Sequence, residues 1–221
     1  MLSLAGCGSV QTPAIDAKVD IDAAPDAAGC QPKVLLAGGT SVTTQGWSVV
    51  MQPPAQLTNG PDYASLQTST NMGATTSGQL LLNYPGALET GKPFRLQVVM
   101  LVESVKPHNQ FDSAAAIMGS FAPPFGVGND RNQMVYLDAG KVGWGDDTAS
   151  FDAQVANNAY HTYELSVDAS GMARFTVDGV LALTRPGFTF NGAIAIGDQT
   201  NDANVDSTLR IRSVTKLCVD P

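Results

Sequence analysis

The chain has 221 residues, a formal net charge of −8 and a pI of about 4.5, and only 14% of its residues are charged. This length suits one domain with a substantial core and leaves little room for two. The 12 Lys and Arg residues are scattered along an acidic chain that repels phosphate, so nucleic acid is excluded as an expected partner.

The chain starts with a short apolar segment that ends in a cysteine. Residues 4–7 read LAGC, which resembles the bacterial lipobox, and the resemblance implies a lipid anchor on Cys7. Residues 1–7 lack the basic segment and the longer apolar stretch of a complete signal peptide, so an accidental match is the alternative. Gly8, where an inner-membrane retention signal would place Asp, favours the outer membrane. We expect an outer-membrane lipoprotein of a bacterial cell envelope, or otherwise a secreted protein.

Residues 8–29 are rich in Ala, Asp, Pro and Gly and have few large apolar side chains. Such a segment cannot bury enough surface to fold. As a coil it would span on the order of 25 to 30 Å. We therefore expect a disordered tether over 8–29, after a residual signal segment over 1–7 and before one folded domain over 30–221. A leader without a tethering role is the alternative.

Two further cysteines lie near the two ends of the expected domain. If Cys7 carries a lipid, Cys30 and Cys218 remain, and terminal strands that lie side by side in a sandwich would bring them together. An export compartment would oxidise them. A disulfide that closes so long a loop would stabilise the folded chain by roughly 5 kcal/mol, because it lowers the entropy of the unfolded chain. We expect a Cys30–Cys218 disulfide, with two free thiols as the alternative.

From residue 31 onward, short runs of β-branched and aromatic residues alternate with Gly, Pro, Asn and Asp. This pattern is typical of an all-β antiparallel sandwich or barrel. No stretch of ten or more residues has helical periodicity. In chain order, the predicted strands are 46–51, 63–68, 78–84, 94–104, 114–119, 133–138, 141–144, 160–168, 173–178, 180–184, 193–198 and 207–217.

The segment 160–184 gives the clearest local prediction. Alternation in its first strand places His161, Tyr163, Leu165 and Val167 on the inner face and polar residues on the outer face. The dipeptide Asp-Gly at 178–179 is a strong signal for a two-residue hairpin turn. We predict a meander of three antiparallel strands.

The same segment carries a family resemblance. The run YHTYELSVDASGMARFTVDGVLAL, a later strand that ends IAIGD and a final strand STLRIRSVTKL follow in this order. They resemble the C-terminal half of a concanavalin A-like lectin/glucanase domain of the laminin-G-like kind. The resemblance implies a two-sheet antiparallel jelly-roll sandwich. Because lectins, hydrolases and adhesion modules share this architecture, the fold alone does not decide among them.

Catalytic patterns are sparse. Glucanases of this fold usually carry Glu-x-Asp-x-x-Glu on one strand, and none of the three glutamates lies in such a pattern. Glu164 and Asp168 share a strand face, but about 13 Å separates them, which fits neither a retaining nor an inverting glycosidase. No nucleophile elbow accompanies the two histidines. We expect His161 to be a hydrogen-bonded structural residue and His108 a solvated loop residue, with ligand binding as the alternative for His108. We lean against an enzyme.

Two acidic loops are candidates for calcium binding. In GDQTNDANVD at 197–206, the spacing of Asp202, Asn204 and Asp206 matches the start of an EF-hand loop, but Ser207 and Ser213 replace the required Gly and Glu. The resemblance instead implies calcium bound by rim loops that would meet at one edge. Turn formation by Asp and Asn is the favoured interpretation of these loops, and calcium binding is the alternative. The candidate metal ligands are Asp198, Asp202, Asn204 and Asp206 in this loop, and Asp146 and Asp147 in the loop 143–152.

A glycan site would need exposed aromatic rings beside polar side chains. Trp144 is flanked by glycines, and we expect it to be exposed; burial of aromatic rings in the core is the alternative. The predicted ligand-binding residues are Trp144, Tyr136, Phe125, Asn129, Asp130 and Arg131. We predict a non-catalytic module that binds a glycan or another surface polymer, with calcium as a candidate aid. A protein-binding adhesion module and a divergent glycan hydrolase are the rivals, and the sequence does not indicate the oligomeric state.

Overall fold

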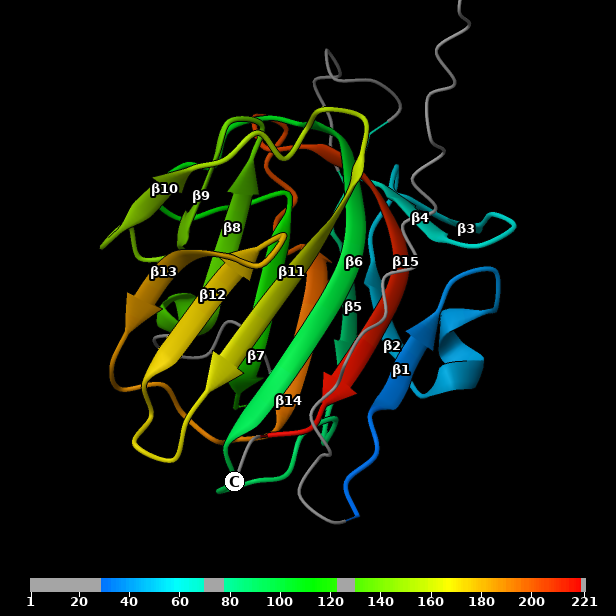
Figure 1. Cartoon of the computed structure of the whole chain (residues 1–221). Coiled ribbons are helices and arrows are strands. Elements are labelled where there is room, and N and C mark those ends of the chain that lie inside the picture. The colour runs from blue at the N-terminus through cyan, green and yellow to red at the C-terminus, as the bar shows by residue number, and fades with distance from the viewer. Residues whose placement is uncertain (1–28, 70–77, 123–129, 220–221) are drawn as a thin grey trace, which may run out of the picture.

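Two antiparallel sheets face each other in the described part of the chain, which comprises residues 29–69, 78–122 and 130–219 of a computed structural model (Figure 1). The first sheet has the strand order β13 (Val180–Arg185), β12 (Ala173–Val177), β11 (Tyr160–Val167), β6 (Phe94–Val105), β15 (Ser207–Leu217), β4 (Ala64–Gln67) and β3 (Gln56–Asn59), and β1 (Lys33–Ala37) pairs with the far end of β15. The second has the order β10 (Ser150–Asp152), β9 (Lys141–Trp144), β8 (Met134–Asp138), β7 (Ala116–Phe121), β14 (Ala193–Asp198), β5 (Leu80–Tyr84) and β2 (Ser48–Met51). The predicted all-β jelly-roll sandwich is confirmed.

In the described residues, helix is confined to two short 3-10 turns, η1 (Val42–Gln45) and η2 (Asp130–Gln133). Within the described residues, no helix is long and apolar enough to cross a membrane. The sequence prediction missed β1, β3 and β10, which are short strands of three to five residues. β3 and β10 are edge strands with few apolar residues, and β1, KVLLA, is a short apolar run without alternation, so none of them has a periodicity that can be recognised before its partner is known.

The predicted meander is confirmed. β11 pairs with β12 and β12 with β13, and β11 also pairs with β6 over its whole length. Tyr163, Leu165 and Val167 are at most 1% exposed and face the second sheet, as their alternation predicted. His161 lies at the partly exposed start of β11, where its ring nitrogens contact Asp178 Oδ2 at 2.6 Å and Asn157 Oδ1 at 3.0 Å. It is therefore the hydrogen-bonded structural histidine that we expected.

The central strands of the second sheet are buried on both faces. Every residue of β7 and β14 is buried. Their inner side chains join the core between the sheets, and the outer ones form a second apolar cluster with neighbouring strands. Burial on both faces explains why β14 reads as the continuous run AIAI instead of alternating. The outer cluster comprises Leu81, Ala116, Met118, Phe121, Met134, Ala193 and Ala195.

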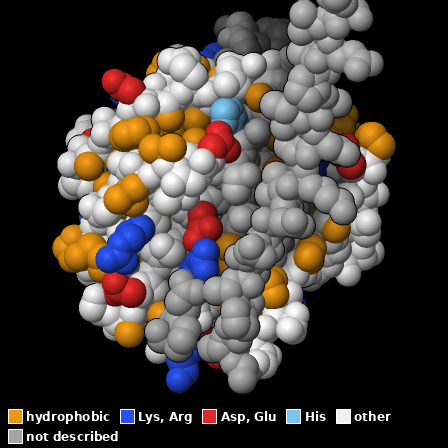
Figure 2. All heavy atoms as spheres, viewed as in Figure 1, with side chains coloured by type: hydrophobic (Ala, Val, Ile, Leu, Met, Phe, Trp, Pro, Cys, Tyr) orange, Lys and Arg blue, Asp and Glu red, His pale blue; other side chains and the backbone are white. Residues whose placement is uncertain are grey.

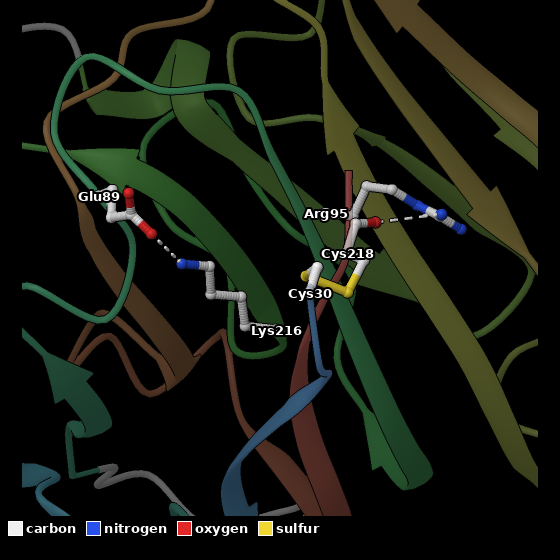
Figure 3. The surroundings of a disulfide bond; sticks show 5 residues. All are labelled: Cys30, Glu89, Arg95, Lys216 and Cys218. Atoms are coloured by element: carbon white, nitrogen blue, oxygen red, sulfur yellow. Dashed lines mark hydrogen bonds and ion pairs between the residues drawn. A yellow bond between two sulfur atoms is a disulfide. The ribbon is translucent and has the colours of Figure 1, made fainter. Parts of the chain in front are cut away.

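The predicted disulfide is confirmed. Cys30 precedes β1 and Cys218 follows β15, and the antiparallel pairing of these two strands brings their Cα atoms to 6.0 Å. Figure 3 shows the bond beside the Glu89–Lys216 ion pair, and the Arg95 guanidinium donates to the Cys218 carbonyl. The two ends of the described domain are thus joined covalently at the same end of the sandwich.

Candidate functional site

Three loops meet at the end of the sandwich where β6 ends and β7 begins. The connection 106–115 between these strands lies between the loop 145–149, which joins β9 to β10, and the loop 199–206, which joins β14 to β15. His108 Nε2 lies 2.9 Å from Asp147 Oδ1, and Asn109 Nδ2 donates to Asp202 Oδ2 at 3.3 Å. The two acidic loops therefore lie on either side of residues 106–113, and we call this assembly the 106–113 rim.

His108 is fixed on all sides. Its backbone N–H donates to Asp138 Oδ1 at 2.9 Å, its Nδ1 lies 2.8 Å from Asp138 Oδ2, and its ring stacks on Tyr136 at 3.6 Å between centroids. Only 11% of its side chain is exposed, so the expectation of a solvated loop histidine is wrong. Because both ring nitrogens face carboxylates, neither is free to activate a serine or cysteine, as nucleophilic catalysis would require.

Phe111 is the exposed aromatic residue of the rim. The carboxamide oxygen of Asn109 accepts the N–H groups of Phe111 and Asp112 at 2.8 and 3.0 Å, and the Asn109 N–H donates to the Asp112 carbonyl. The Phe111 carbonyl accepts hydrogen bonds from Gln199 and Arg131, which come from different loops. The backbone is thus held on both sides while 69% of Phe111 is exposed. Because this turn is already ordered, a ligand that binds the exposed ring would cause little further loss of conformational entropy in the protein.

Sequence reasoning did not identify Phe111. Its segment, KPHNQFD, has no strand periodicity, and an exposed aromatic cannot be told from a buried one without tertiary contacts. The available signal was Asn109 two residues before the aromatic, because Asn commonly accepts a backbone N–H two residues ahead.

The acidic loop 199–206, together with Asp198 at the end of β14, is built from turns. Asp198 Oδ1 accepts the Thr200 N–H at 2.9 Å, and Asp202 Oδ1 accepts both the N–H and the side-chain amide of Asn204. Lys106 closes the loop from the other side, since its Nζ lies 2.5 Å from Asp206 Oδ2 and donates to the Ala203 carbonyl at 2.6 Å. Asp202 and Asn204 therefore act as turn residues, as the favoured interpretation of this loop proposed.

Asp198 is buried beneath this loop and has no counter-ion among its described contacts. Burial raises the pKa of its carboxyl from an ordinary 3.8 to about 8, against the lowering effect of hydrogen bonds from Thr200 and Thr68. Asp206 and Asp112 nearby raise the pKa further through their negative charge. Asp198 therefore holds a proton at neutral pH.

The carboxylates of the second acidic loop, 145–149, also have partners from other parts of the chain. Asp146 accepts two hydrogen bonds from the Arg185 guanidinium at 3.1 and 2.8 Å and one from the Thr148 hydroxyl. Burial acts to raise the pKa of Asp146, but these hydrogen bonds outweigh it and hold the pKa below its ordinary value. Asp147, with a positive φ of 58°, directs its carboxylate to His108.

The predicted calcium ligands do not converge on one point. Within the described ranges, no group of three or more His, Cys, Asp or Glu side chains is arranged to hold a metal ion. Lys106, Arg185 and His108 already contact the carboxylates of Asp206, Asp146 and Asp147. As arranged, these residues do not fit a calcium ion, which needs six to eight oxygens around one centre.

The predicted aromatic patch is wrong for its two central residues. Trp144 is fully buried, because its pairing with Val135 turns it into the core, where it packs on Phe188 and lies under the Arg185 guanidinium. The flanking glycines signal close packing instead of exposure. Tyr136 points away from the core, but it is 2% exposed beneath His108. A Cβ on Gly143 would lie 2.3 Å from its hydroxyl oxygen, so glycine is required there.

The other predicted ligand residues divide into two groups. Arg131 is partly exposed and lies at the rim, where it holds the Phe111 carbonyl. Phe125, Asn129 and the side chain of Asp130 lie outside the described residues.

Two cavities are lined by residues that were considered for function. One of about 380 Å³ lies beside the rim and is lined by Pro107, His108, Asp138, Ala139, Gly140 and Lys141. Another of about 330 Å³ on the outer face of the first sheet is lined in part by Glu164 and Asp168, but Glu164 pairs with Arg95 and Asp168 with Arg174. Figure 2 shows acidic and basic side chains side by side on this face. The face therefore forms neither a basic patch nor an acidic cleft.

Comparison with known proteins identifies similar folds but shows no family for this chain. No protein-family model and no curated protein matches the sequence. Among solved structures, the chain is similar to a carbohydrate esterase of the Shiga toxin-encoding bacteriophage phi24B, with a TM-score of 0.56 and 15% identity over 86% of this chain and 100% of the other. It is also similar to the exoplasmic/lumenal domain of VIP36 in a Ca²⁺- and mannose-bound form, with a TM-score of 0.54 and 11% identity over 85% and 91%. A protein of unknown function from Shewanella oneidensis MR-1 covers 96% of this chain and 95% of its own at 10% identity, with a TM-score of 0.53. At these identities the likeness shows a lectin-like β-sandwich fold.

Proposed function

We propose that this protein is a non-catalytic module that binds a neutral glycan or a similar surface polymer at the 106–113 rim. The observation that carries the proposal is Phe111, which is 69% exposed on a turn fixed by Asn109, Gln199 and Arg131. One face of a sugar ring consists of C–H groups and packs on an aromatic ring, while its hydroxyls require polar partners around it. The structures of VIP36 with mannose and of a phage carbohydrate esterase support the proposal by fold.

The charges of the rim favour a neutral ligand. Asp112, Asp147 and Asp202 lie on the loops around Phe111, and the whole chain carries a net charge of −8. Uronic or sialic acids would meet the same sign of charge. We therefore expect neutral polysaccharides to bind better than anionic ones, and the preference to weaken at high salt.

The side-chain contacts support a non-catalytic role. The Glu164 and Asp168 carboxylates are each paired with an arginine, and Asp146 is held by Arg185. A general acid must keep its proton near neutral pH, and the guanidinium beside Asp146 favours the opposite state. His108 has both ring nitrogens on carboxylates. None of these groups is poised for hydrolysis.

We also propose that Cys7 carries a lipid and that residues 8–29 tether the domain to the outer membrane of a bacterial envelope. Both segments lie outside the described residues. The Cys30–Cys218 disulfide supports export, because such bonds persist in oxidising compartments. The division into 1–7, 8–29 and 30–221 remains a prediction.

A polysaccharide binding screen with Phe111→Ala tests the proposed function. We expect the wild-type domain to bind at least one neutral polysaccharide, and Phe111→Ala to bind it at least about tenfold more weakly, a loss of about 1.4 kcal/mol. The melting temperature should not change, because the removed ring is exposed. Val180→Ala is the matched control, since Val180 is 58% exposed on β13.

Three outcomes would contradict the proposal. Equal binding by Phe111→Ala and wild type would place the site elsewhere. Binding to a protein ligand with silence across the sugars would favour the adhesion module, and release of reducing ends from a bound polysaccharide would favour a hydrolase.

A further inference from the structure

The loop 199–206 has the composition of a cation-binding loop and contains a cation supplied by the chain itself. Asp206 is 0% exposed, and its Oδ2 lies 2.5 Å from the ammonium nitrogen of Lys106. The same ammonium donates to the Ala203 carbonyl at 2.6 Å. A carboxylate and a loop carbonyl are the kinds of oxygen that hard cations such as calcium select. A positive charge therefore already lies between these two oxygens.

The backbone holds Lys106 in register with the loop. The Lys106 N–H donates to the Asp206 carbonyl at 2.8 Å, at the point where β6 has ended and β15 is about to begin. Only 20% of the Lys106 side chain is exposed. Lys106 therefore comes from the segment that leads directly into His108 and Asn109, and its ion pair joins the loop to the rim.

Asp206 has more acceptor capacity than the ammonium satisfies. Its side chain is 0% exposed, and its Oδ1 is buried without a hydrogen-bond partner in the described structure. A buried carboxylate without a positive partner is strongly destabilising. The site thus requires one cation, and with Lys106 present a second one would be repelled at short range.

From this geometry we propose that the Lys106 ammonium occupies a divalent-cation site in the loop 199–206 and takes over the metal's structural role. The rim then keeps its shape without calcium, and removing the ammonium exposes a site that calcium or magnesium can fill. The part of this inference that concerns glycan affinity rests on the function proposed above, whereas the part that concerns stability does not.

Thermal melts of the domain test the inference without any sugar. Wild type, Lys106→Met and Lys92→Met are each compared in EDTA, in millimolar calcium chloride and in millimolar magnesium chloride. Methionine keeps the length and the apolar stem of lysine and removes the charge. Lys92 is an exposed lysine in the β5–β6 connection and serves as the matched control.

We expect wild type and Lys92→Met to melt at the same temperature in all three solutions. Lys106→Met should melt several degrees lower in EDTA, and calcium should raise its melting temperature in proportion to the logarithm of the calcium concentration above the dissociation constant. A calcium-dependent rise in wild type would overturn the inference, because the site would then accept a metal beside Lys106. A Lys106→Met protein that is destabilised but insensitive to both metals would also overturn it.

Two further measurements test the inference about the Lys106 ammonium if Lys106→Met does not fold. Lys106→Arg keeps the charge and should retain the melting temperature more closely than Lys106→Gln, and the reverse order would overturn the inference. The affinity of wild type for its polysaccharide should be the same, within about twofold, in calcium and in EDTA. If wild type binds no polysaccharide, the proposed function fails, while the melts still test Lys106.

Discussion

The buried carboxyl of Asp198 makes the stability of the fold depend on pH in a defined direction. Its side chain is 0% exposed, and burial raises its pKa from 3.8 to about 8. Between these two values the folded chain holds a proton that the unfolded chain releases. Because the unfolded state binds fewer protons there, the free energy of unfolding falls as the pH rises. One such group contributes a slope of about 1.4 kcal/mol per pH unit.

Asp198→Asn should remove this slope. Between pH 5 and pH 7 the wild-type domain should lose about 3 kcal/mol through Asp198, and the variant should lose none of it. Asparagine keeps an oxygen that can accept the Thr200 N–H. All other titrating groups are common to the two proteins, so their contributions cancel in the difference.

Urea unfolding at pH 5, 6 and 7 measures this difference. The gap between variant and wild type should grow by about 1.4 kcal/mol per pH unit in favour of Asp198→Asn. Parallel pH profiles for the two proteins would refute the reasoning, because Asp198 would then titrate alike in the folded and the unfolded chain. Asp168→Asn, at an exposed turn carboxylate paired with Arg174, should show no such rise.

Two other predictions concern the ends of the chain. Replacing both Cys30 and Cys218 by Ser should cost up to about 5 kcal/mol, because the bond closes a loop with a sequence separation of 188 residues; an unchanged urea midpoint would contradict this estimate. Mass spectrometry of protein purified from bacterial membranes should find Cys7 modified by a diacylglyceryl thioether and an acyl chain, and a free thiol at Cys7 would argue against the anchor.

The strands were predictable because their periodicity is local. In β11 the alternation of Tyr163, Leu165 and Val167 with polar residues fixes both the strand and its inner face. The Asp-Gly turn at 178–179 then fixes the neighbouring pairing of β12 and β13. The short strands β3 and β10 have no comparable pattern and exist because longer partners offer them a hydrogen-bonding edge.

The disulfide was predictable for a related reason. Once the two segments that carry Cys30 and Cys218 are assigned to the ends of one sandwich, antiparallel pairing of β1 with β15 is enough to join them. The prediction required the topology of the ends and no detail of side-chain packing.

The rim was not predictable from the sequence, because it is held by contacts between residues far apart in the chain. Asn109 meets Asp202 across 93 positions, and Gln199 meets the Phe111 carbonyl across 88. Each contact is a hydrogen bond between loops that have no internal periodicity. The composition of the loops favoured polar turns over calcium ligands without excluding the latter, and the tertiary structure adds the placement of Lys106 beside Asp206.

By itself, the sequence determined the fold class, the meander and the positions of the main strands along the chain, because these follow from short-range alternation and from turn chemistry. The disulfide followed from the placement of its two cysteines at the two ends of one sandwich. The tertiary structure decided which side chains face solvent. The register of β8 and β9 buries Trp144, whereas cross-loop hydrogen bonds hold Phe111 outward. Exposure is a property of the neighbours that a side chain acquires on folding. Some of these neighbours, such as Phe188 beside Trp144 and Gln199 at the Phe111 carbonyl, lie tens of residues away in the chain.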